Sequence, residues 1–411
     1  MRTMRLISRP LPERLTLAIL GFFMMMAPAS IDMYLPALSF VARDLHTSMA
    51  RVQLSISWFL FGFGLGQLLW GPLSDRFGRR APLLAGLVLF IGASLACAQA
   101  HSINQLMIAR FVQALGACAM PVIAQAIARD VWGKRSAHAL SIMVLVMSIA
   151  PLVAPIVGAQ ILRVTILPLA SWRIVFALLT ATGVIALAWL AILPETRPAQ
   201  ARGDIRAKTI ALNYLHLLRD RRYLGYVLTG AAIWGAMFAY VTGTPFVYIV
   251  YFHLSPQTFS FLFAANVFGM MAITFLNTKL LRTHSSDALL RVGLTGGALC
   301  ALLLVLAWYT GWLTLGTTIV LLLVFMSLRG FVSANAVAGA LAHHPERAGA
   351  AAAFAGFLQF TGGSVGGKAV SVLGNGTPLP MLIVVATFSV IALGLQWAFI
   401  RPARATSSSQ H

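Results

Sequence analysis

The chain has 411 residues, of which 59% are hydrophobic and only 10% are charged. Soluble domains carry about 25% charged residues, so this composition excludes a soluble globular protein, a disordered protein and a coiled coil. A lipid bilayer is the solvent that fits. Because a membrane-spanning helix needs about 20 apolar residues, a chain of this length with short loops has room for roughly twelve spans.

Apolar runs bounded by charges, Gly/Pro or polar clusters predict the spans in chain order. The first run follows four arginines and contains Ala27-Pro28-Ala29, which together outline a secretory signal. The apolar pattern continues to Val41, however, so we expect an uncleaved first span. The predicted helices cover residues 15–41, 52–71, 82–100, 104–128, 138–162, 172–194, 223–249, 258–278, 290–309, 314–342, 349–373 and 379–400.

The net charge of +20, from 30 Lys and Arg against 10 Asp and Glu, is scattered between the apolar runs. A nucleic-acid-binding protein would gather this charge in one patch, so we expect no nucleic-acid partner. Most of the basic residues lie in the two tails and in the loops after even-numbered spans. The loops on the opposite side of the membrane hold four basic residues, Arg43, Arg51, Arg163 and Arg173. This asymmetry predicts that both termini and the central loop are cytoplasmic.

The longest polar stretch, Glu195 to Arg222, divides the spans six and six. We therefore predict an all-α membrane protein of twelve transmembrane helices in two six-helix halves. The first bundle is residues 1–194, the cytoplasmic linker is 195–222, and the second bundle is 223–411. The halves also resemble each other weakly, since the loop at 71–80 has a degraded counterpart at 277–291. Parallel repeats of this kind place a binding site between the halves, near the midplane.

Ionisable residues inside the predicted spans are few. Asp32 is the only acidic one, and Arg110, Arg329 and Lys368 are the basic ones. Each costs about 2.5–3.5 kcal/mol on insertion scales, so each is a candidate functional residue. No histidine lies deep in a span, which argues against a histidine proton relay.

Asp32 and Arg110 are predicted to lie in the outer half of the bundle. At 1.5 Å per residue their depths from the outer surface are roughly 15 Å and 9 Å, so the two side chains could meet. Pro28 and Pro36 flank Asp32 and free backbone carbonyls near it. Asp32 suits a proton carrier, because a moving partner or an arriving solute would change its proton affinity. The alternative is a static Asp–Arg pair that holds two helices together.

The loop Gly71-Pro72-Leu73-Ser74-Asp75-Arg76-Phe77-Gly78-Arg79-Arg80 is the strongest local signal. Its glycines permit a tight turn where two helix ends approach each other. Asp75 can face a helix N-terminus or a cation, and the arginines can face helix C-termini or lipid phosphate. The spacing of these residues goes beyond an ordinary basic cytoplasmic loop.

This loop resembles the signature loop of the major facilitator superfamily. Arg110-Phe111-Val112-Gln113-Ala114-Leu115-Gly116 resembles the fourth-span motif of that family, and residues 150–159 resemble the fifth-span motif of its proton-antiporting exporters. Three further segments are similar to the bicyclomycin/chloramphenicol-resistance (Bcr/CflA) drug exporters. They are Ile31 to Leu38, Thr244-Pro245-Phe246-Val247-Tyr248 and Gly356-Phe357-Leu358-Gln359-Phe360.

The resemblance implies proton-driven export of small drugs across the bacterial inner membrane. Asp32 would carry the proton and Arg110 would couple it to transport. Asp75 would lock the inner gate by pairing with charge near Arg129 and the start of span 11. The gate residues implied in this way are Gly71, Asp75, Arg76, Gly78, Arg79, Arg80 and Arg129.

The resemblance also implies a kinked span 5, shaped by Pro151, Pro155 and Gly158 at the interface between the halves. Ala150 and Ala159 stand where such exporters often have glycine, so a weaker bend is expected. Spans 10 and 11 of the family usually lack charge, yet this chain has Arg329 and Lys368. Lys368 can snorkel to the outer surface. Arg329 either faces the central cavity, where it would attract an anionic solute, or reaches a helix C-terminus or a loop.

Aromatic and polar residues inside the spans are candidates for solute binding, because drug pockets are mostly apolar with a few polar groups. Each is also a candidate for ordinary helix packing. The candidates are Tyr34, Gln113, Trp234, Phe238, Tyr240, Asn266, Arg329, Asn335 and Gln359. Residues 362–369, GGSVGGKA, come close to a phosphate-binding loop, but they follow no strand, so we expect close helix packing there.

The sequence thus predicts a proton-coupled drug exporter without a bound cofactor, acting as a monomer. One alternative is a proton-coupled transporter of a metabolite such as an amino acid, a nucleoside or an anionic solute. A membrane-embedded enzyme acting on lipid is the other class considered. It would need a catalytic cluster inside the spans, and one acidic residue with no deep histidine does not supply one.

Overall fold

The computed structural model describes residues 11–163, 171–198, 200, 207–341 and 348–399, and within these ranges the chain is helical and contains no strand. The first six spans comprise α1 (Glu13–Asp32) with η1 (Leu35–Ala37) and α2 (Leu38–Asp44), α3 (Met49–Phe77), α4 (Arg80–Ala98), α5 (Ile103–Trp132), α6 (Ser136–Met147) with α7 (Ala150–Ile161), and α8 (Ser171–Ile192). The last six comprise α10 (Arg221–Pro245) with η4 (Phe246–Tyr251), α11 (Pro256–Leu280), α12 (Ser286–Tyr309), α13 (Leu315–Leu328) with η5 (Arg329–Phe331) and α14 (Ser333–Leu341), α15 (Ala348–Val372) and α16 (Leu379–Phe399).

These elements confirm the twelve predicted spans. Ten helical stretches of the described chain are long and apolar enough to cross a bilayer, and one of them, Ile103–Ile161, contains two spans. The 25-residue helix α15 is also of spanning length. Large apolar side chains such as Phe268 and Trp397 are more than two-thirds exposed on the outside of the bundle. Lipid is the solvent in which such a surface is stable.

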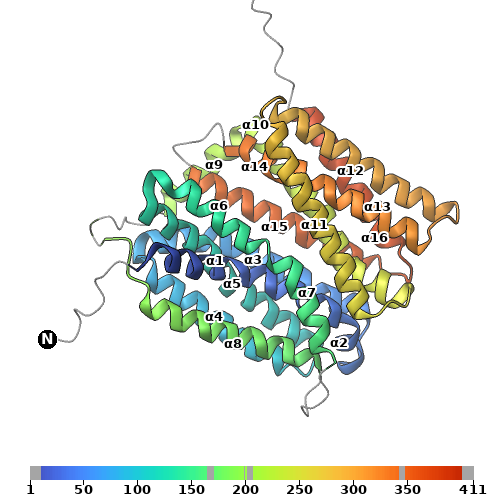
Figure 1. Ribbon diagram of the computed structural model, residues 1–411, viewed down its shortest axis with the longest axis horizontal. Coiled ribbons are helices and arrows are strands. Elements are labelled where there is room, and N and C mark those ends of the chain that lie inside the picture. The colour runs from blue at the N-terminus through green and yellow to red at the C-terminus, as the bar shows by residue number, and fades with distance from the viewer. Residues whose placement is uncertain (1–10, 164–170, 199, 201–206, 342–347, 400–411) are drawn as a thin grey trace, which may run out of the picture.

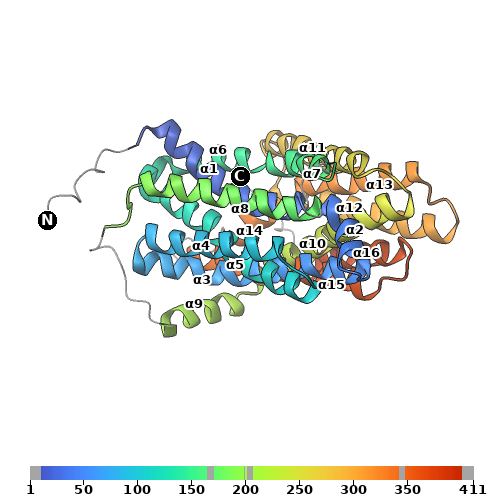
Figure 2. The same ribbon diagram turned by 90° about the horizontal axis from the view of Figure 1, so that it is seen from below.

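The spans form two bundles, drawn blue to green and yellow to red in Figure 1. α3, α4 and α5 pack together in the first bundle, and α10, α15 and α16 pack together in the second. Helix α9 (Ala207–Arg219), in the linker, lies outside both bundles in Figure 2. Leu217 on this helix is buried in the second bundle's linker-side cluster.

The first span of each bundle is interrupted after a proline. Pro36 has no N–H to donate to the carbonyl of Asp32, and the helix tightens there into the 3₁₀ segment η1. Pro245 ends α10 in the second bundle, and the π-helical segment η4 follows it. The freed backbone carbonyls that the sequence predicts near Asp32 are therefore present, and a corresponding break occurs in the second bundle.

Glycines in the GGSVGG segment of α15 allow it to pack very closely on α10. A Cβ atom at Gly362 would collide with the carbonyl oxygen of Ala231, and one at Gly366 with that of Gly235. The prediction of close helix packing for this segment is confirmed. Lys368, four residues before the end of α15, has an exposed side chain.

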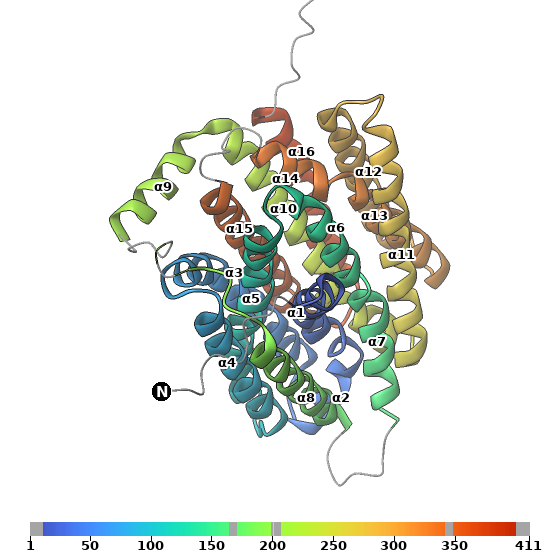
Figure 3. The same cartoon turned by 60° about the vertical axis from the view of Figure 1, so that its left-hand side comes forward.

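The two bundles touch mainly at one end. We call this the far end, and we call the opposite end, which carries the linker and the loop at 71–80, the linker end. At the far end α7 packs closely on α11, whereas α6 does not, and Figure 3 shows α7 alongside α11. The side-chain hydrogen bonds that join the bundles in the described chain run from Gln53 to Thr242, from Ser364 to Ser57, from Gln257 to Ala159 and from Ser260 to Pro155.

The contact between α3 and α15 extends from the far end to Gln67 and Gly356. Gly356 is the ninth residue of α15 counted from the linker end. Nearer to the linker end, the charged loop at 71–80 makes its side-chain contacts within the first bundle and with the start of the linker, at Glu195 and Arg197. The structure is therefore a conformation closed at the far end and separated at the linker end.

Candidate functional site

Arg110 lies completely buried inside the first bundle. Its Nη1 donates to the carbonyl oxygen of Ser30 at 2.9 Å and to Oε1 of Gln113 at 2.7 Å. Three rings surround the guanidinium, with centroids at 4.3 Å for Phe59, 4.9 Å for Tyr34 and 5.6 Å for Phe176. Cation–π contacts gain strength when they are shielded from water, so these rings compensate part of the buried charge.

Ser30 can accept this bond because α1 ends two residues later. The N–H of Tyr34, which would bond to Ser30 in a continuing α-helix, donates to the carbonyl oxygen of Ile31 instead. The break that Pro36 produces thus creates the acceptor that holds Arg110. In this way the fourth span holds the first span at the level of Asp32.

Asp32 does not pair with Arg110. Its side chain is 7% exposed and forms no ion pair or hydrogen bond with the residues that the structure describes. The expectation that the two charges meet is therefore wrong for this conformation, because Arg110 is occupied by a carbonyl, an amide and aromatic rings. The static Asp–Arg pair is wrong for the same reason. The segment that follows Asp32 closely, η1, packs on α10 and α11 of the other bundle.

Span 5 is broken, and its two parts have different neighbours. α6 ends at Met147 and α7 begins at Ala150, after a turn at Ser148 and Ile149. Pro151 and Pro155 remove two backbone donors from α7. The backbone of Ser148 and Ile149 stays in the α-helical region, so a short turn interrupts the span where the sequence predicts a bend, and the weaker bend stays a prediction. Gly158 packs against the backbone next to Asp32, and a Cβ there would collide with the carbonyl oxygen of Met33.

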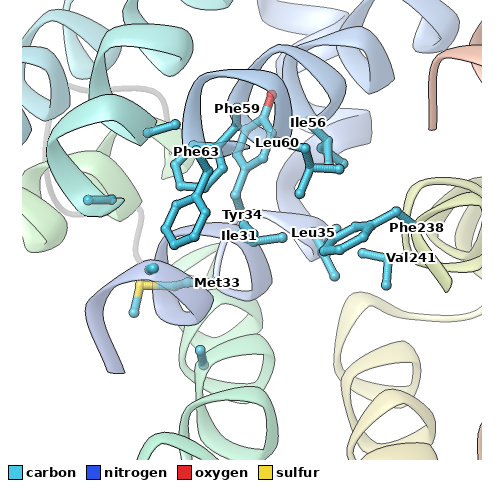
Figure 4. Packing of buried hydrophobic residues seen from close by; sticks show 14 of the residues in the cluster. Ile31, Met33, Tyr34, Leu35, Ile56, Phe59, Leu60, Phe63, Phe238 and Val241 are labelled. Carbon is cyan, nitrogen blue, oxygen red and sulfur yellow. The ribbon is translucent and has the colours of Figure 1, made fainter. Parts of the chain in front are cut away.

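An aromatic chain crosses the interface between the bundles. Phe63 of α3 lies 4.3 Å from Phe360 of α15, measured between ring centroids, and Phe360 lies 4.7 Å from Trp234 of α10. Phe238 continues the chain 5.6 Å from Trp234. Figure 4 shows Phe238 and Val241 of α10 facing Leu35 of the first span, beside the stack of Phe59 and Phe63.

Sequence reasoning chose Trp234 and Phe238 but missed Phe63 and Phe360. The signal was present, because Phe59 and Phe63 stand four residues apart on α3 and therefore share a face. Phe360 closes the segment that carries the family resemblance. Gln359, its neighbour, lies beside Gly230 of α10 and is partly exposed.

The other candidates for solute binding are packed within a bundle. The hydroxyl of Tyr34 is 3.0 Å from Oγ of Ser55, and Nε2 of Gln113 donates to Oγ of Ser94. Asn335 donates to Asn277 and to the carbonyl oxygen of Phe331. Solute contact by Tyr34, Gln113 and Asn335 is thus not supported in this conformation, because their polar groups already have protein partners.

Tyr240 and Asn266 form a polar pair in the second bundle. Nδ2 of Asn266 donates to the hydroxyl oxygen of Tyr240 at 2.7 Å, and both residues are buried. The two residues lie on neighbouring spans of the second bundle, α10 and α11.

Arg329 does not face the other bundle. It is 4% exposed, and its Nη1 donates to the carbonyl oxygen of Ile233 in the middle of α10 at 2.7 Å. The small cavity beside it is lined by residues of α10, α12, α13, η5 and α16 and by Val332. Both alternatives for Arg329 are therefore wrong, because its partner is neither a solute space between the bundles nor a helix end or loop.

The loop at 71–80 is the centre of an ionic cluster at the linker end. Arg79 pairs with Asp130 at 2.7 Å and with Asp75 at 2.8 Å. Arg197 pairs with Asp75 at 3.0 Å, and the carboxylate of Glu195 accepts from the backbone N–H groups of Arg79 and Arg80 at the start of α4. Burial of Arg79 opposes its charge, but the bonds and charges of Asp130 and Asp75 outweigh burial and raise the pKa of Arg79.

Asp75 pairs with Arg79 and Arg197 in this conformation, so the predicted pairing with charge near Arg129 and the start of span 11 is not made here. The start of span 11 belongs to the other bundle, which is separated from the first bundle at this end. Arg129 forms no ion pair with the described residues. Gly78 joins α3 to α4 with a φ of 84°, a left-handed conformation that glycine adopts easily. Gly71 has open space around its Cα, and Arg76 stacks on Phe77.

Two bundles of six helices with broken first spans and a buried carboxyl group in the first span are typical of helical membrane transporters. Residues 18–367 match the family described as Major Facilitator Superfamily. The chain therefore belongs to the major facilitator superfamily, and its relatives assign it to the bicyclomycin/chloramphenicol-resistance branch.

Those relatives cover nearly the whole chain. It is 36% identical to the "Uncharacterized MFS-type transporter YdgK" of Bacillus subtilis, over 92% of this chain and 94% of the relative. It is 32% identical to the "Bicyclomycin resistance protein homolog" of Haemophilus influenzae, over 91% and 93%, and 31% identical to the "Chloramphenicol resistance protein" of Pseudomonas aeruginosa, over 92% and 89%. The xylose transporter XylE of E. coli shares the fold with a TM-score of 0.74 at 15% identity, over 94% of this chain and 98% of XylE.

Proposed function

We propose that this protein exports small-molecule drugs from the bacterial cytoplasm in exchange for protons. The names of the relatives point to resistance to bicyclomycin and chloramphenicol. The observation that carries the proton coupling is Asp32, an acidic residue in the first span with no ion pair or hydrogen bond among the described residues. A carboxyl group that is not locked in a salt bridge can gain and lose a proton during transport.

The position of Asp32 supplies the coupling. It lies where α1 breaks, on the N-terminal side of the carbonyl group against which Gly158 packs, and η1, just after it, packs on α10 and α11 of the other bundle. Proton binding removes a negative charge from the contact between the bundles. Arg110 holds the Ser30 carbonyl and so keeps α1 in place while this charge changes.

The two bundles move as bodies in this proposal, residues 1–194 against 223–411, joined by the linker at 195–222. The linker end is cytoplasmic, as are both termini, and the membrane is the bacterial inner membrane. The cluster of Asp75, Arg79, Asp130 and Arg197 stays within the first bundle while the linker end is separated. Closure of that end brings Asp75 toward the start of α15.

The proton gradient can drive such export. One charge that crosses about 100 mV gains about 2.3 kcal/mol, so roughly 150 mV gives about 3.5 kcal/mol. This energy sustains a gradient of a few hundred-fold for a neutral solute when one net charge enters per cycle. Coupling requires that proton and solute prefer different conformations, since a ligand that binds both equally shifts neither. The protein works in this scheme as a monomer, without a cofactor and without catalysis.

The substitution Asp32→Asn tests the proposal. Efflux of chloramphenicol against its gradient is expected to be lost, because the amide cannot carry a proton. The measurement is drug transport into inverted vesicles energised with a proton gradient, with size-exclusion chromatography to verify folding. Asp44→Asn is the matched control, since Asp44 sits at the far end in an ion pair with Arg173.

Uphill efflux by a folded Asp32→Asn variant at the wild-type rate would remove Asp32 from the mechanism. The direction of transport is measured in the same vesicles. Release of a preloaded amino acid or nucleoside from these vesicles together with protons, with no movement of any drug, would instead make the protein a metabolite transporter.

A further inference from the structure

Helix α9 (Ala207–Arg219) of the linker keeps an apolar face exposed. Leu212, Leu215 and Leu218 are 46–47% exposed, although they lie on a folded helix that packs on the protein. Residues three apart are neighbours on the surface of a helix, so these leucines form one strip, which we call the leucine face. Such a strip is unfavourable in water, and an apolar partner is therefore expected to cover it.

A different side of the same helix is fixed to the second bundle. Leu217 is buried, and the ring of Tyr214 lies 5.6 Å from the ring of Phe354 in α15, measured between centroids. Tyr214 and Leu217 are also three residues apart, and they point to a side of α9 other than the leucine face. The protein thus holds α9 in place and leaves the leucine face uncovered.

The orientation of α9 suits the surface of a membrane. The helix lies at the linker end, outside both bundles, and Figure 3 shows it running across the direction of α4 and α8. Because the spans cross the bilayer, a helix that runs across them at one end lies along the bilayer surface. An amphipathic helix in this position buries its apolar side at the boundary between headgroups and acyl chains.

The chain around α9 is basic. Residues 195–222 hold seven Lys and Arg against three Asp and Glu. Arg219, Arg221 and Arg222, at the end of α9 and the start of α10, are exposed and form no ion pair with the described residues. Exposed arginines beside an apolar helix face attract the phosphates of anionic lipids. A second copy of the chain, with the same net charge of +20, would be repelled instead.

We propose that α9 binds the surface of the membrane. Its leucine face lies at the acyl-chain boundary, and Arg219, Arg221 and Arg222 contact the phosphates of anionic phospholipids. The contact holds the linker end of the second bundle against the lipid leaflet on that side. It is separate from the solute path between the bundles, and it requires only that the chain spans a membrane, so it does not depend on the proposed drug export.

A nitroxide spin label at Leu215→Cys tests where the leucine face lies. The full-length protein is reconstituted into vesicles of phosphatidylcholine and phosphatidylglycerol, without drug or proton gradient, and its three native cysteines are buried. The label should be accessible to oxygen, which concentrates in lipid, and shielded from a water-soluble nickel chelate. His216→Cys is the matched control, because His216 is exposed on another side of α9, and its label should stay accessible to the chelate.

Equal access of the chelate to the two labels would place the leucine face in water and overturn the proposal. Low access of both oxygen and the chelate to the label at position 215 would overturn it as well, because the leucine face would then be covered by protein.

The double variant Arg219→Gln/Arg221→Gln tests the requirement for anionic lipid in the same labelled protein. Each Lys or Arg near an anionic surface favours binding about fivefold, so the loss of two should lower the ratio of docked to undocked helix roughly thirtyfold. Lys279→Gln/Arg282→Gln is the matched control and should leave this ratio unchanged. It removes the same charge from the linker end of α11 and the turn after it. An equal loss in both variants, or an equal ratio in vesicles of phosphatidylcholine alone, would overturn binding to an anionic surface.

Discussion

Single residues in this protein show how a buried charge is kept without an opposite charge. Nη1 of Arg110 donates to the Ser30 carbonyl and the Gln113 amide, and three rings surround the guanidinium, whose Nε and Nη2 have no hydrogen-bond partner among the described residues. A salt bridge between Arg110 and Asp32 would hold both side chains in their charged forms. Because Arg110 binds other groups, the carboxyl group of Asp32 is left without an ion pair among the described residues. The groups that compensate the buried charge of Arg110 thus all belong to the first bundle. The carboxyl group of Asp32 is not one of them.

Gly158 is the residue whose size matters most directly for this arrangement. Gly158→Ala places a methyl group against the Met33 carbonyl, next to Asp32, and should destabilise the folded protein by about 1–3 kcal/mol through overpacking. Transport should fall as α1 and α7 are forced apart. Thermal unfolding and vesicle efflux measure both effects.

Gly92→Ala is the control for this substitution, because Gly92 lies inside α4 with open space around it. It should leave transport intact and raise stability by about 0.4–1 kcal/mol, since alanine loses less backbone freedom on folding. Equal behaviour of the two variants would contradict the role of the close approach at Met33.

The elements that decide the conformation are broken helices. α7 packs on α11 of the other bundle, whereas α6, the other part of the same span, does not. In an uninterrupted helix, a rotation of one half would also rotate the other half. The turn at Ser148 and Ile149 divides the span into a far-end part that is docked on α11 and a linker-end part that is not.

Two hydrogen bonds to α7 should hold the far end closed. Gln257 and Ser260 of α11 donate to the carbonyl oxygens of Ala159 and Pro155 at 2.9 Å each. The double variant Gln257→Leu/Ser260→Ala should weaken closure by about 1–3 kcal/mol, because each bond contributes about 0.5–1.5 kcal/mol. This energy corresponds to about a 5–150-fold shift toward a conformation open at the far end.

Spin labels at His101 and Trp312, in exposed far-end loops of the two bundles, would report this shift as longer distances. Thr274→Ala is the control, since Thr274 lies on the same helix and bonds only within it, to Met270. Unchanged distances in the double variant would show that these bonds do not set the equilibrium.

At the scale of the whole molecule, the far-end interface buries two hydroxyl groups that have no hydrogen-bond partner among the described residues. The hydroxyl groups of Ser57 in α3 and Thr242 in α10 are buried, face the same side of Gly367, and lack hydrogen-bond partners. A buried hydroxyl without a partner costs about 1–3 kcal/mol. Water would satisfy both groups when the far end opens, so they favour opening.

The double variant Ser57→Ala/Thr242→Val should therefore stabilise the conformation closed at the far end and slow transport. The same spin-label pair measures the expected shift toward the short distance. Thr229→Val is the control, because Thr229 also has a buried hydroxyl without a partner but lies in the linker-end part of α10. A shift of equal size in Thr229→Val would contradict an effect specific to the interface.

The amino-acid sequence by itself determined the spans, their division six and six, and the residues that carry charge inside the membrane. These features depend on local composition, because a bilayer demands long apolar helices and penalises each charge. The tertiary structure alone decided the partners. Arg110 turned to a carbonyl freed by Pro36, Asp75 to Arg197, and Arg329 into its own bundle, since contacts between distant segments depend on how helices rotate and on which end of the bundles is closed.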